Sequence, residues 1–269
     1  MQLEAKVFAV TGGGNGIGRE VVLALLARGA SVAAMDVRDV ALAETARLAG
    51  ANAKRLTSHA VDITDRAAVE QVPTAVIAAH GQVDGLLNVA GIIQQFVPFA
   101  ELDYPEIERV LAVNFWGVVH TTKAFLPHLL TRPEACVVNV SSMGGFLPVP
   151  GQTVYGASKA AVKLLTEGLY SELKDSQVSV TVVFPGGVAT DITGNSGVRA
   201  PGGGGDTSAA AAKLATPTDA AQQIVAGVER GSYRVVIGKD ARMMDRLSRL
   251  APQRATDLIA RKMASLVGK

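Results

Sequence analysis

The sequence contains almost no cysteine, few aromatic residues and nearly no net charge. Cys136 is its only cysteine, so no disulfide can form within the chain, which is usual in a reducing compartment. Lys and Arg number 26 against 24 Asp and Glu, and aromatic residues make up 4%. Nucleic-acid surfaces usually interleave basic clusters with aromatic rings, so we expect no nucleic-acid partner. Cys136 lies in an apolar run and is expected to be a buried structural thiol.

Long apolar segments are also missing. The first residues, Met1 to Lys6, lack the basic region and apolar core of a secretory signal, and no apolar run is long enough to span a bilayer. We therefore expect a soluble cytoplasmic protein. Apolar residues nevertheless make up 48% of the chain, and about 250 residues commonly form one α/β domain. A single domain with a large core is the prediction.

A glycine-rich turn follows the first predicted strand. Residues 7–10 are apolar, Thr11 to Gly18 carry the glycines, and apolar residues then recur at helical spacing from Val21. A turn of this kind at a helix N-terminus directs backbone N–H groups and the positive end of the helix dipole at a phosphate. The sequence therefore predicts a phosphate-binding turn.

Asp36 comes directly after a second predicted strand, residues 31–35, about 20 positions beyond the glycine turn. A carboxylate at this place accepts hydrogen bonds from the adenosine ribose of a dinucleotide. It would repel the extra phosphate of NADP, and Val37 offers that phosphate no cation, although Arg19 and Arg38 lie nearby in sequence. NAD is the predicted cofactor and NADP the less favoured one. The alternative is that Asp36 is a solvated acid at a strand end.

Strands and helices alternate along the rest of the chain. Apolar strands are expected at residues 53–61, 83–89, 135–141, 177–184 and 234–238, and helices at 40–49, 65–80, 104–131, 153–174 and 217–230. Apolar, non-alternating strands between helices are typical of a parallel sheet covered on both faces. Asp62 with Ile63, and Asn88 with Ala90 and Gly91, follow the third and fourth strands. They are expected at the carboxyl edge of the sheet, where open α/β sheets bind ligands.

Tyr155 and Lys159 stand four residues apart, so on a helix both side chains lie on one face. A cation near a phenol favours the phenolate and lowers the tyrosine pKa toward neutrality, as a general acid/base requires. Taken alone, such a pair is more often an ordinary surface pair.

Two C-terminal regions differ in composition from the rest. Residues 193–215 include four consecutive glycines, 202–205, and we expect an active-site lid over about 190–215, the alternative being a solvent loop. The tail, 239–269, carries one apolar stripe of Met243, Leu247 and Leu250 and another of Ile259, Met263 and Leu266, separated near Pro252, with a basic polar side. Packing on a partner subunit or over the substrate mouth is favoured over contact with a membrane surface.

Several motifs occur in a fixed order, with a characteristic spacing between Ser142 and Tyr155. They are Thr11-Gly12-x-x-x-Gly16-x-Gly18, Asp62, Asn88-x-Ala90-Gly91, Asn114, Ser142, Tyr155-x-x-x-Lys159 and Pro185-Gly186. With this set the chain resembles the short-chain dehydrogenase/reductase family over about residues 5–238. Val89 departs from the commonest pattern, and the tail is longer than the minimal family fold.

The resemblance implies a single Rossmann-type, doubly wound α/β domain with a seven-stranded parallel sheet. Its cofactor-binding half would cover about residues 1–92 and its catalytic half about 93–238, with 239–269 as a helical extension. It also implies a homo-oligomer, a dimer or tetramer built on the long helices.

By the same resemblance, Tyr155 is the general acid/base, and Lys159 lowers its pKa while bonding the nicotinamide ribose. Ser142 polarises the substrate oxygen, and Asn114 holds a water that links Lys159 to solvent. Ser142 could instead only cap a turn, Asn114 only satisfy backbone groups and Thr190 only cap the lid helix. The predicted cofactor-binding residues are Gly12, Asn15, Gly16, Ile17, Gly18, Asp36, Asp62, Ile63, Asn88, Ala90, Gly91, Tyr155, Lys159, Pro185, Gly186, Val188 and Thr190. No metal ligands are assigned.

The predicted activity is hydride transfer between NAD(H) and a secondary alcohol or ketone. The expected pocket lining is mostly apolar and favours, slightly, a steroid-like or other lipophilic small-molecule substrate. That lining is Ile92, Ile93, Phe96, Phe146, Leu147, Val149 and Val154. One alternative is an NADPH-dependent ketoacyl-thioester or quinone reductase of the same family. A dinucleotide-sensing protein without catalysis would be expected to lack members of the catalytic set, and none is lacking.

Overall fold

Seven parallel strands form one sheet, in the order β3-β2-β1-β4-β5-β6-β7. The computed structural model describes residues 1–198 and 214–264. The chain moves outward from β1 to β3 and then crosses back to β4, beside β1. The predicted doubly wound, Rossmann-type α/β fold is confirmed. The strands are β1 (Val7–Thr11), β2 (Ser31–Asp36), β3 (Leu56–Ala60), β4 (Gly85–Asn88), β5 (Ala135–Val140), β6 (Val178–Pro185) and β7 (Arg234–Ile237).

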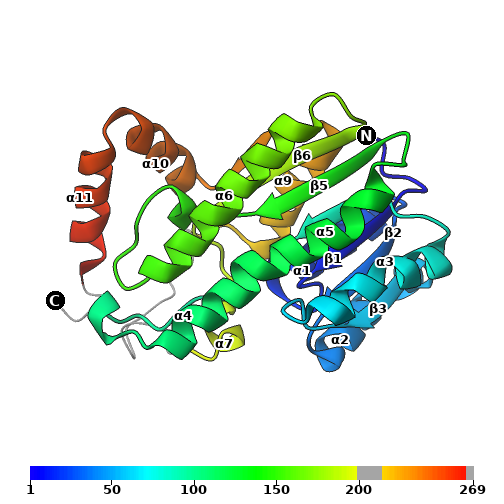
Figure 1. Cartoon of the computed structure of the whole chain (residues 1–269), viewed down its shortest axis with the longest axis horizontal. Coiled ribbons are helices and arrows are strands. Elements are labelled where there is room, and N and C mark those ends of the chain that lie inside the picture. Colours follow the sequence, from blue (N-terminus) through cyan, green and yellow to red (C-terminus); the bar gives the residue numbers. More distant parts are fainter. Residues whose placement is uncertain (199–213, 265–269) are drawn as a thin grey trace.

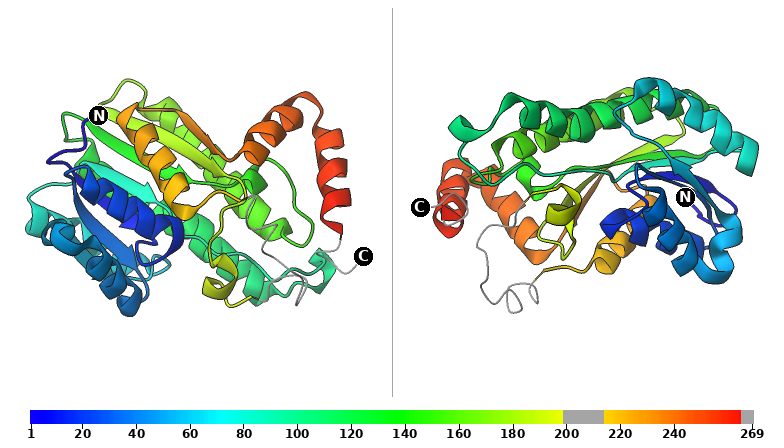
Figure 2. Two further views of the ribbon diagram at one scale, coloured as in Figure 1. Left: turned by 180° about the vertical axis from the view of Figure 1, so that it is seen from behind. Right: turned by 90° about the horizontal axis from the view of Figure 1, so that it is seen from below.

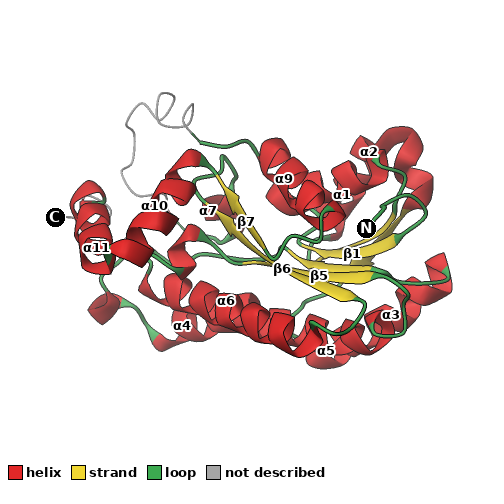
Figure 3. Ribbon diagram, turned by 90° about the horizontal axis from the view of Figure 1, so that it is seen from above, coloured by secondary structure: helices red, strands yellow, loops and turns green. Residues whose placement is uncertain are grey.

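Helices cover both faces of the sheet (Figure 1, Figure 3). Helices α1, α2 and α9 lie on one face, and α3, α5 and α6 on the other, with α4 continuing the line of α5. The helices are α1 (Gly16–Ala27), α2 (Asp39–Ala49), α3 (Arg66–His80), α4 (Tyr104–Leu111), α5 (Gly117–Leu129), α6 (Thr153–Leu173), α7 (Ile192–Asn195), α9 (Pro217–Glu229), α10 (Lys239–Leu250) and α11 (Pro252–Lys262).

The central strands are apolar at consecutive positions because they supply two cores. Phe8 and Val10 of β1 face the core built with α1 and α9. Val7 and Ala9 face the opposite core, built with α3 and α5. Successive side chains of a strand point to opposite faces, so a strand covered on both sides carries no polar alternation.

Two predicted elements are interrupted in the structure. Residues 50–55 form a 3-10 turn, so the strand expected at 53–61 begins only at Leu56. The helical stretch expected at 104–131 contains a π-helical segment, Ala112–Trp116, between α4 and α5. Asn114 lies in that segment and is fully buried. Such π-bulges are frequent at functional sites.

Helices α10 and α11 extend beyond the carboxyl end of the sheet, on the side away from α2 and α3 (Figure 1, Figure 2). Met244 and Ile259 pack there on Leu147, in the loop that follows β5. The predicted stripe of Met243, Leu247 and Leu250 lies along one side of α10, with Met243 53% exposed and Leu250 86% exposed, so its packing on a partner subunit stays a prediction. Within the chain, α10 docks instead through Met244, which is buried. Leu266 lies outside the described residues.

Most of the predicted lid, residues 199–213, also lies outside the described residues. Cys136 is buried, and burial raises its pKa to about 12, as a structural thiol requires. Across residues 1–198 and 214–264, no helix combines the length and apolar character needed to cross a bilayer.

The burial of Met244 predicts a large difference between two neighbouring substitutions. Met244→Ala should lower the free energy of unfolding by about 2–4 kcal/mol, because it leaves a cavity against Leu147. Met243→Ala removes an exposed side chain of the same type and should change it by less than about 0.5 kcal/mol. Equilibrium unfolding in urea measures both. Equal effects would contradict the observed docking of α10.

Candidate active site

A groove of about 580 Å³ runs along the carboxyl edge of the sheet, where the strand order reverses between β1 and β4. Open α/β sheets bind ligands at this switch point. Much of the predicted cofactor set lines the groove and comes from the ends of four strands and from the segment after β6. These residues are Gly12, Asn15, Gly16, Ile17, Gly18, Asp36, Asp62, Ile63, Ala90, Gly91 and Thr190.

The glycine turn is shaped by close backbone contacts. Gly12 has a φ of +70°, and a Cβ there would lie 2.9 Å from Ala90 Cα. A Cβ on Gly18 would collide with the carbonyl of Gly12. Asn15 caps α1, since its side chain accepts a hydrogen bond from Gly16 N at 2.6 Å. The start of α1 therefore meets the groove with little side-chain bulk, as a phosphate cradle requires.

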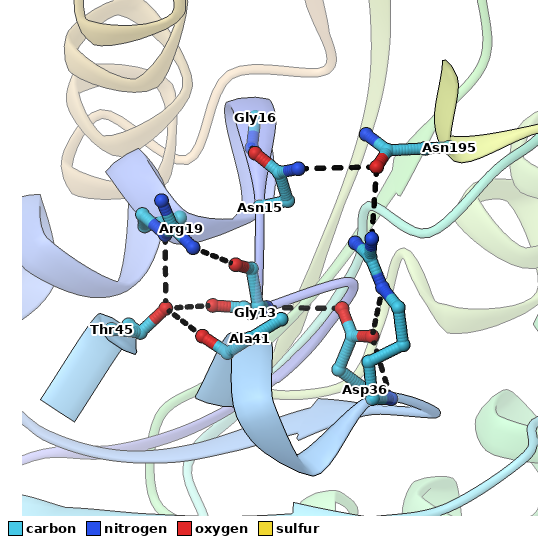
Figure 4. A network of polar contacts seen from close by, with 10 residues as sticks. Gly13, Asn15, Gly16, Arg19, Asp36, Ala41, Thr45 and Asn195 are labelled. Carbon is cyan, nitrogen blue, oxygen red and sulfur yellow. Dashed lines mark hydrogen bonds and ion pairs between the residues drawn. The ribbon is translucent and has the colours of Figure 1, made fainter. Parts of the chain in front are cut away.

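Asp36 is held by the main chain at the end of β2 (Figure 4). Its carboxylate accepts hydrogen bonds from Gly14 N at 3.0 Å and Arg38 N at 3.1 Å. Arg38 Nε lies 3.7 Å from the same carboxylate. Arg19 is bound to Thr45 Oγ1 at 3.1 Å and to the Gly14 carbonyl, whereas Arg38 lines the groove. Of the two arginines near Asp36, Arg38 is therefore the one that a ligand in the groove would meet.

Asn195 of α7 bridges the two walls of the groove (Figure 4). Its Oδ1 accepts hydrogen bonds from Asn15 Nδ2 at 3.1 Å and Arg38 Nη1 at 3.0 Å. Sequence reasoning missed Asn195, because its partner Asn15 is 180 positions away. Thr190 does not cap α7; Asp191 does, by accepting from Gly194 N at 3.1 Å. A Cβ on Gly16 would instead lie 3.5 Å from Thr190 Cγ2.

Tyr155 on α6 lies beside Ser142, which follows β5, since a Cβ on Gly144 would lie 3.3 Å from Tyr155 Cε1 and 3.5 Å from Ser142 Oγ. Burial raises the pKa of Tyr155, the nearby Ser142 hydroxyl lowers it, and burial prevails. The expectation that Lys159 brings this pKa toward neutrality stays a prediction. Ser142 also has the capping role considered as its alternative, since its Oγ accepts from Gly144 N at 3.0 Å.

Lys159 is 3% exposed and donates a hydrogen bond from Nζ to the Val140 carbonyl at 3.0 Å. Burial lowers its pKa to about 8, because the charged ammonium is less stable out of water. A Cβ on Gly91 would lie 2.9 Å from Lys159 Nζ. The lysine therefore reaches the wall of the groove.

Asn114 is fully engaged with protein groups. Its Oδ1 accepts from Ile92 N at 2.9 Å, and its Nδ2 donates to the Ile92 carbonyl at 2.9 Å and to Ser158 Oγ at 3.0 Å. Its side chain thus has the structural role considered as an alternative. The water that Asn114 would hold stays a prediction.

Asn88 does not reach the groove with its side chain. It is 2% exposed and bonds Asn139 Oδ1 at 2.8 Å, Thr121 Oγ1 at 2.7 Å and Thr122 Oγ1 at 3.2 Å. The amide joins β4 to β5 and α5, and the predicted role of Asn88 in cofactor binding stays a prediction. Pro185, Gly186 and Val188 are likewise not among the lining residues. Pro185 ends β6, and Gly186 and Val188 follow it in the turn where Gly187 N donates to Asp240 Oδ2 at 3.0 Å.

Some of the residues predicted to line a substrate pocket lie at or near the groove, and others are packed elsewhere. Ile92 lines the groove, and Ile93 and Val154 are buried close to the start of α6. Leu147 is 1% exposed and belongs to the core beneath α10 and α11, so its predicted place on a pocket wall is wrong. Phe146 packs edge-on against Phe184, with ring centroids 5.4 Å apart.

Known proteins resemble this chain over nearly its whole length. A family model described as short chain dehydrogenase matches residues 6–199. A Mycobacterium tuberculosis protein named as oxidoreductase SadH is 39% identical over 97% of this chain and 96% of its own. A short-chain dehydrogenase/reductase from Burkholderia phymatum, solved with NAD, has a TM-score of 0.84, 26% identity and coverage of 94% and 96%. One from Burkholderia cenocepacia, solved with NADP, has a TM-score of 0.79, 27% identity and coverage of 96% and 99%.

The burial of Lys159 predicts a pH-dependent stability cost. Its pKa falls from 10.5 to about 8 on folding, so the unfolded chain holds more protons between these values. The cost is fully present below pH 8 and is relieved as the pH rises toward 10.5. Lys159→Met should therefore raise the free energy of unfolding at pH 7 by about 1–3 kcal/mol, the gain shrinking as the pH rises to 10.

Lys163 on the same helix is the matched control for that substitution. Its side chain is partly exposed and pairs with Glu167 at 2.7 Å. Lys163→Met should change the free energy of unfolding by less than about 1 kcal/mol. This change should be the same at pH 8 and at pH 10. Denaturant unfolding at several pH values measures both. A Lys159→Met protein less stable than the wild type at pH 7 would contradict the burial cost.

Proposed function

The chain belongs to the short-chain dehydrogenase/reductase family, and we propose that it transfers a hydride between NAD(H) and a secondary alcohol or ketone. The observation that carries the proposal is the side-by-side placement of Tyr155 and Ser142 at Gly144, with Lys159 Nζ reaching the groove wall at Gly91. An acid/base and a second hydroxyl are then available to one substrate oxygen.

The residues of the groove fit a dinucleotide. The close approach of Gly12 to Ala90 and the start of α1 suit a pyrophosphate, and Asp36 suits the adenosine ribose. Ile17, Asp62, Ile63, Ala90, Gly91 and Thr190 complete the walls. The bound nicotinamide supplies or accepts the hydride.

The chain's own residues manage the proton that must accompany the hydride. When a carbinol carbon loses a hydride, its oxygen must lose a proton, and Tyr155 is the group proposed to take it. Ser142 donates a hydrogen bond that holds the substrate oxygen and polarises it. Lys159, with its pKa near 8, gains and loses its proton close to neutral pH, so it is suited to pass a proton beside the tyrosine.

The proposed preference for NAD rests on the carboxylate of Asp36. Two backbone N–H groups fix it at the groove wall, where it would repel the extra phosphate of NADP. Arg38, the cation that could attract that phosphate, is engaged by Asp36 and Asn195.

The proposed substrate is lipophilic. Ile92, Ile93 and Val154 offer apolar side chains beside the groove and the start of α6. A panel of alcohols and ketones of graded polarity, followed by nicotinamide absorbance, tests this preference. Faster turnover of sugars and other polar alcohols than of apolar ones would contradict it.

Replacing the proposed acid/base should abolish turnover without weakening the binding of the cofactor. Tyr155→Phe should lower kcat by about 10²–10⁴-fold, the usual contribution of a general acid/base, while the Kd for NADH measured by fluorescence stays unchanged. Tyr170→Phe, at a residue of the same helix that is 44% exposed, should leave kcat unchanged. Full activity in Tyr155→Phe would show that the assigned reaction is wrong.

The charge of Asp36 should decide between the cofactors. We expect the kcat/KM for NAD to exceed that for NADP by at least about tenfold, and Asp36→Asn to narrow the ratio, because repulsion of the extra phosphate is lost. Steady-state kinetics with both cofactors measures the ratio. A wild-type advantage for NADP would favour the NADPH-dependent reductase instead.

A further inference from the structure

Helix α6 depends on a distant residue for the cap of its N-terminus. The residue before the helix, Gln152, makes no capping hydrogen bond with its side chain. Gln94 Oε1 accepts hydrogen bonds from Val154 N at 2.8 Å and from Tyr155 N at 2.9 Å. The first N–H groups of a helix have no partner within it, so Gln94 satisfies two of them, one belonging to Tyr155.

Gln94 is itself firmly held. It is 0% exposed, and its carbonyl accepts a hydrogen bond from Gln152 Nε2 at 2.8 Å. The preceding residue, Ile93, donates from its N–H to Ser196 Oγ at 3.0 Å. Because Oε1 meets two N–H groups, the amide can be oriented in only one way. In the part of the chain that the structure describes, Gln94 Nε2 is buried without a partner.

The main chain of Tyr155 is held on its other side as well. Its carbonyl accepts a hydrogen bond from Ser158 Oγ at 2.7 Å. Ser158 Oγ accepts in turn from Asn114 Nδ2 at 3.0 Å, and Asn114 is bound to both main-chain groups of Ile92. The segment of Ile92 and Gln94 therefore fixes both the N–H and the carbonyl of Tyr155.

We propose that Gln94 is a positioning residue that aligns Tyr155 with Ser142 by capping α6 at the tyrosine's own amide. The inference rests on the proposed function of Tyr155. Without the acceptor, two buried N–H groups lose their partner, and the first turn of α6 must move or take up water. Displacement of a reacting group by about 1 Å can cost a hundredfold in rate. Tyr155 would then move relative to the Ser142 hydroxyl beside it, which lowers the pKa of the phenol.

The test compares Gln94→Met with Gln95→Met. Methionine keeps the length of the side chain and removes the acceptor, and Gln95 is the exposed neighbour. Gln94→Met should lower kcat by about 10- to 100-fold and keep the KM for NAD within about twofold of wild type. Gln95→Met should leave both kcat and this KM unchanged. The ionisation of Tyr155 should move to higher pH in Gln94→Met. It is measured as the difference in tyrosinate absorbance between each protein and its Tyr155→Phe counterpart.

A second variant keeps the test decisive if Gln94→Met folds poorly. Gln94→Glu retains an acceptor, and a negative charge is favourable at a helix N-terminus. It should keep kcat within about threefold of wild type, with Tyr155 ionising as in the wild type. Equal damage in Gln94→Glu and Gln94→Met would overturn the proposal.

Two other outcomes would also overturn it. One is a wild-type kcat and wild-type Tyr155 ionisation in Gln94→Met. The other is a lower Tm and active fraction with the ionisation unmoved, which a merely structural role would give. The absorbance titration needs no substrate, so it reports on Gln94 even if the Tyr155→Phe assay shows that the proposed reaction is wrong.

Discussion

Parallel pairing of the strands is the constraint on which the site depends. Every strand of a parallel sheet delivers its carboxyl end to the same edge. The glycine turn after β1, Asp36 at the end of β2 and Ser142 after β5 are far apart in sequence, yet they meet there. Helices make this arrangement possible, because they connect one parallel strand to the next and bury both faces of the sheet. The groove follows from how the sheet is built.

The site places polar groups where burial is costly. Lys159 and Tyr155 are both taken out of water, which lowers the pKa of the amine and raises that of the phenol. A main-chain group compensates for part of this cost at Lys159, whose Nζ donates a hydrogen bond to the Val140 carbonyl. The large apolar cores on either face of the sheet supply the stability that lets such groups stay buried.

The sequence predicted well wherever a pattern was local. The glycine turn, the carboxylate about 20 residues later and the succession of strands and helices depend on neighbours, and the fold confirms them. The sequence did not show which face of a helix docks or which partners a buried polar group takes. Met244 rather than Met243 enters the tail core, Leu147 lies under that tail, and Asn88 turns into the sheet instead of the groove.

By itself the sequence determined the family, the strand-and-helix order and the residue types at the sheet edge, because short-range periodicity and motif spacing are written along the chain. Only the tertiary structure decided which side chains orient the others. Gln94 meets Tyr155 across 61 positions, and Asn195 meets Asn15 across 180. These partners are fixed by the packing of loops on the sheet edge, and no local pattern encodes that packing. The pKa values of Tyr155 and Lys159 are likewise shifted by burial, which exists only once the chain has folded.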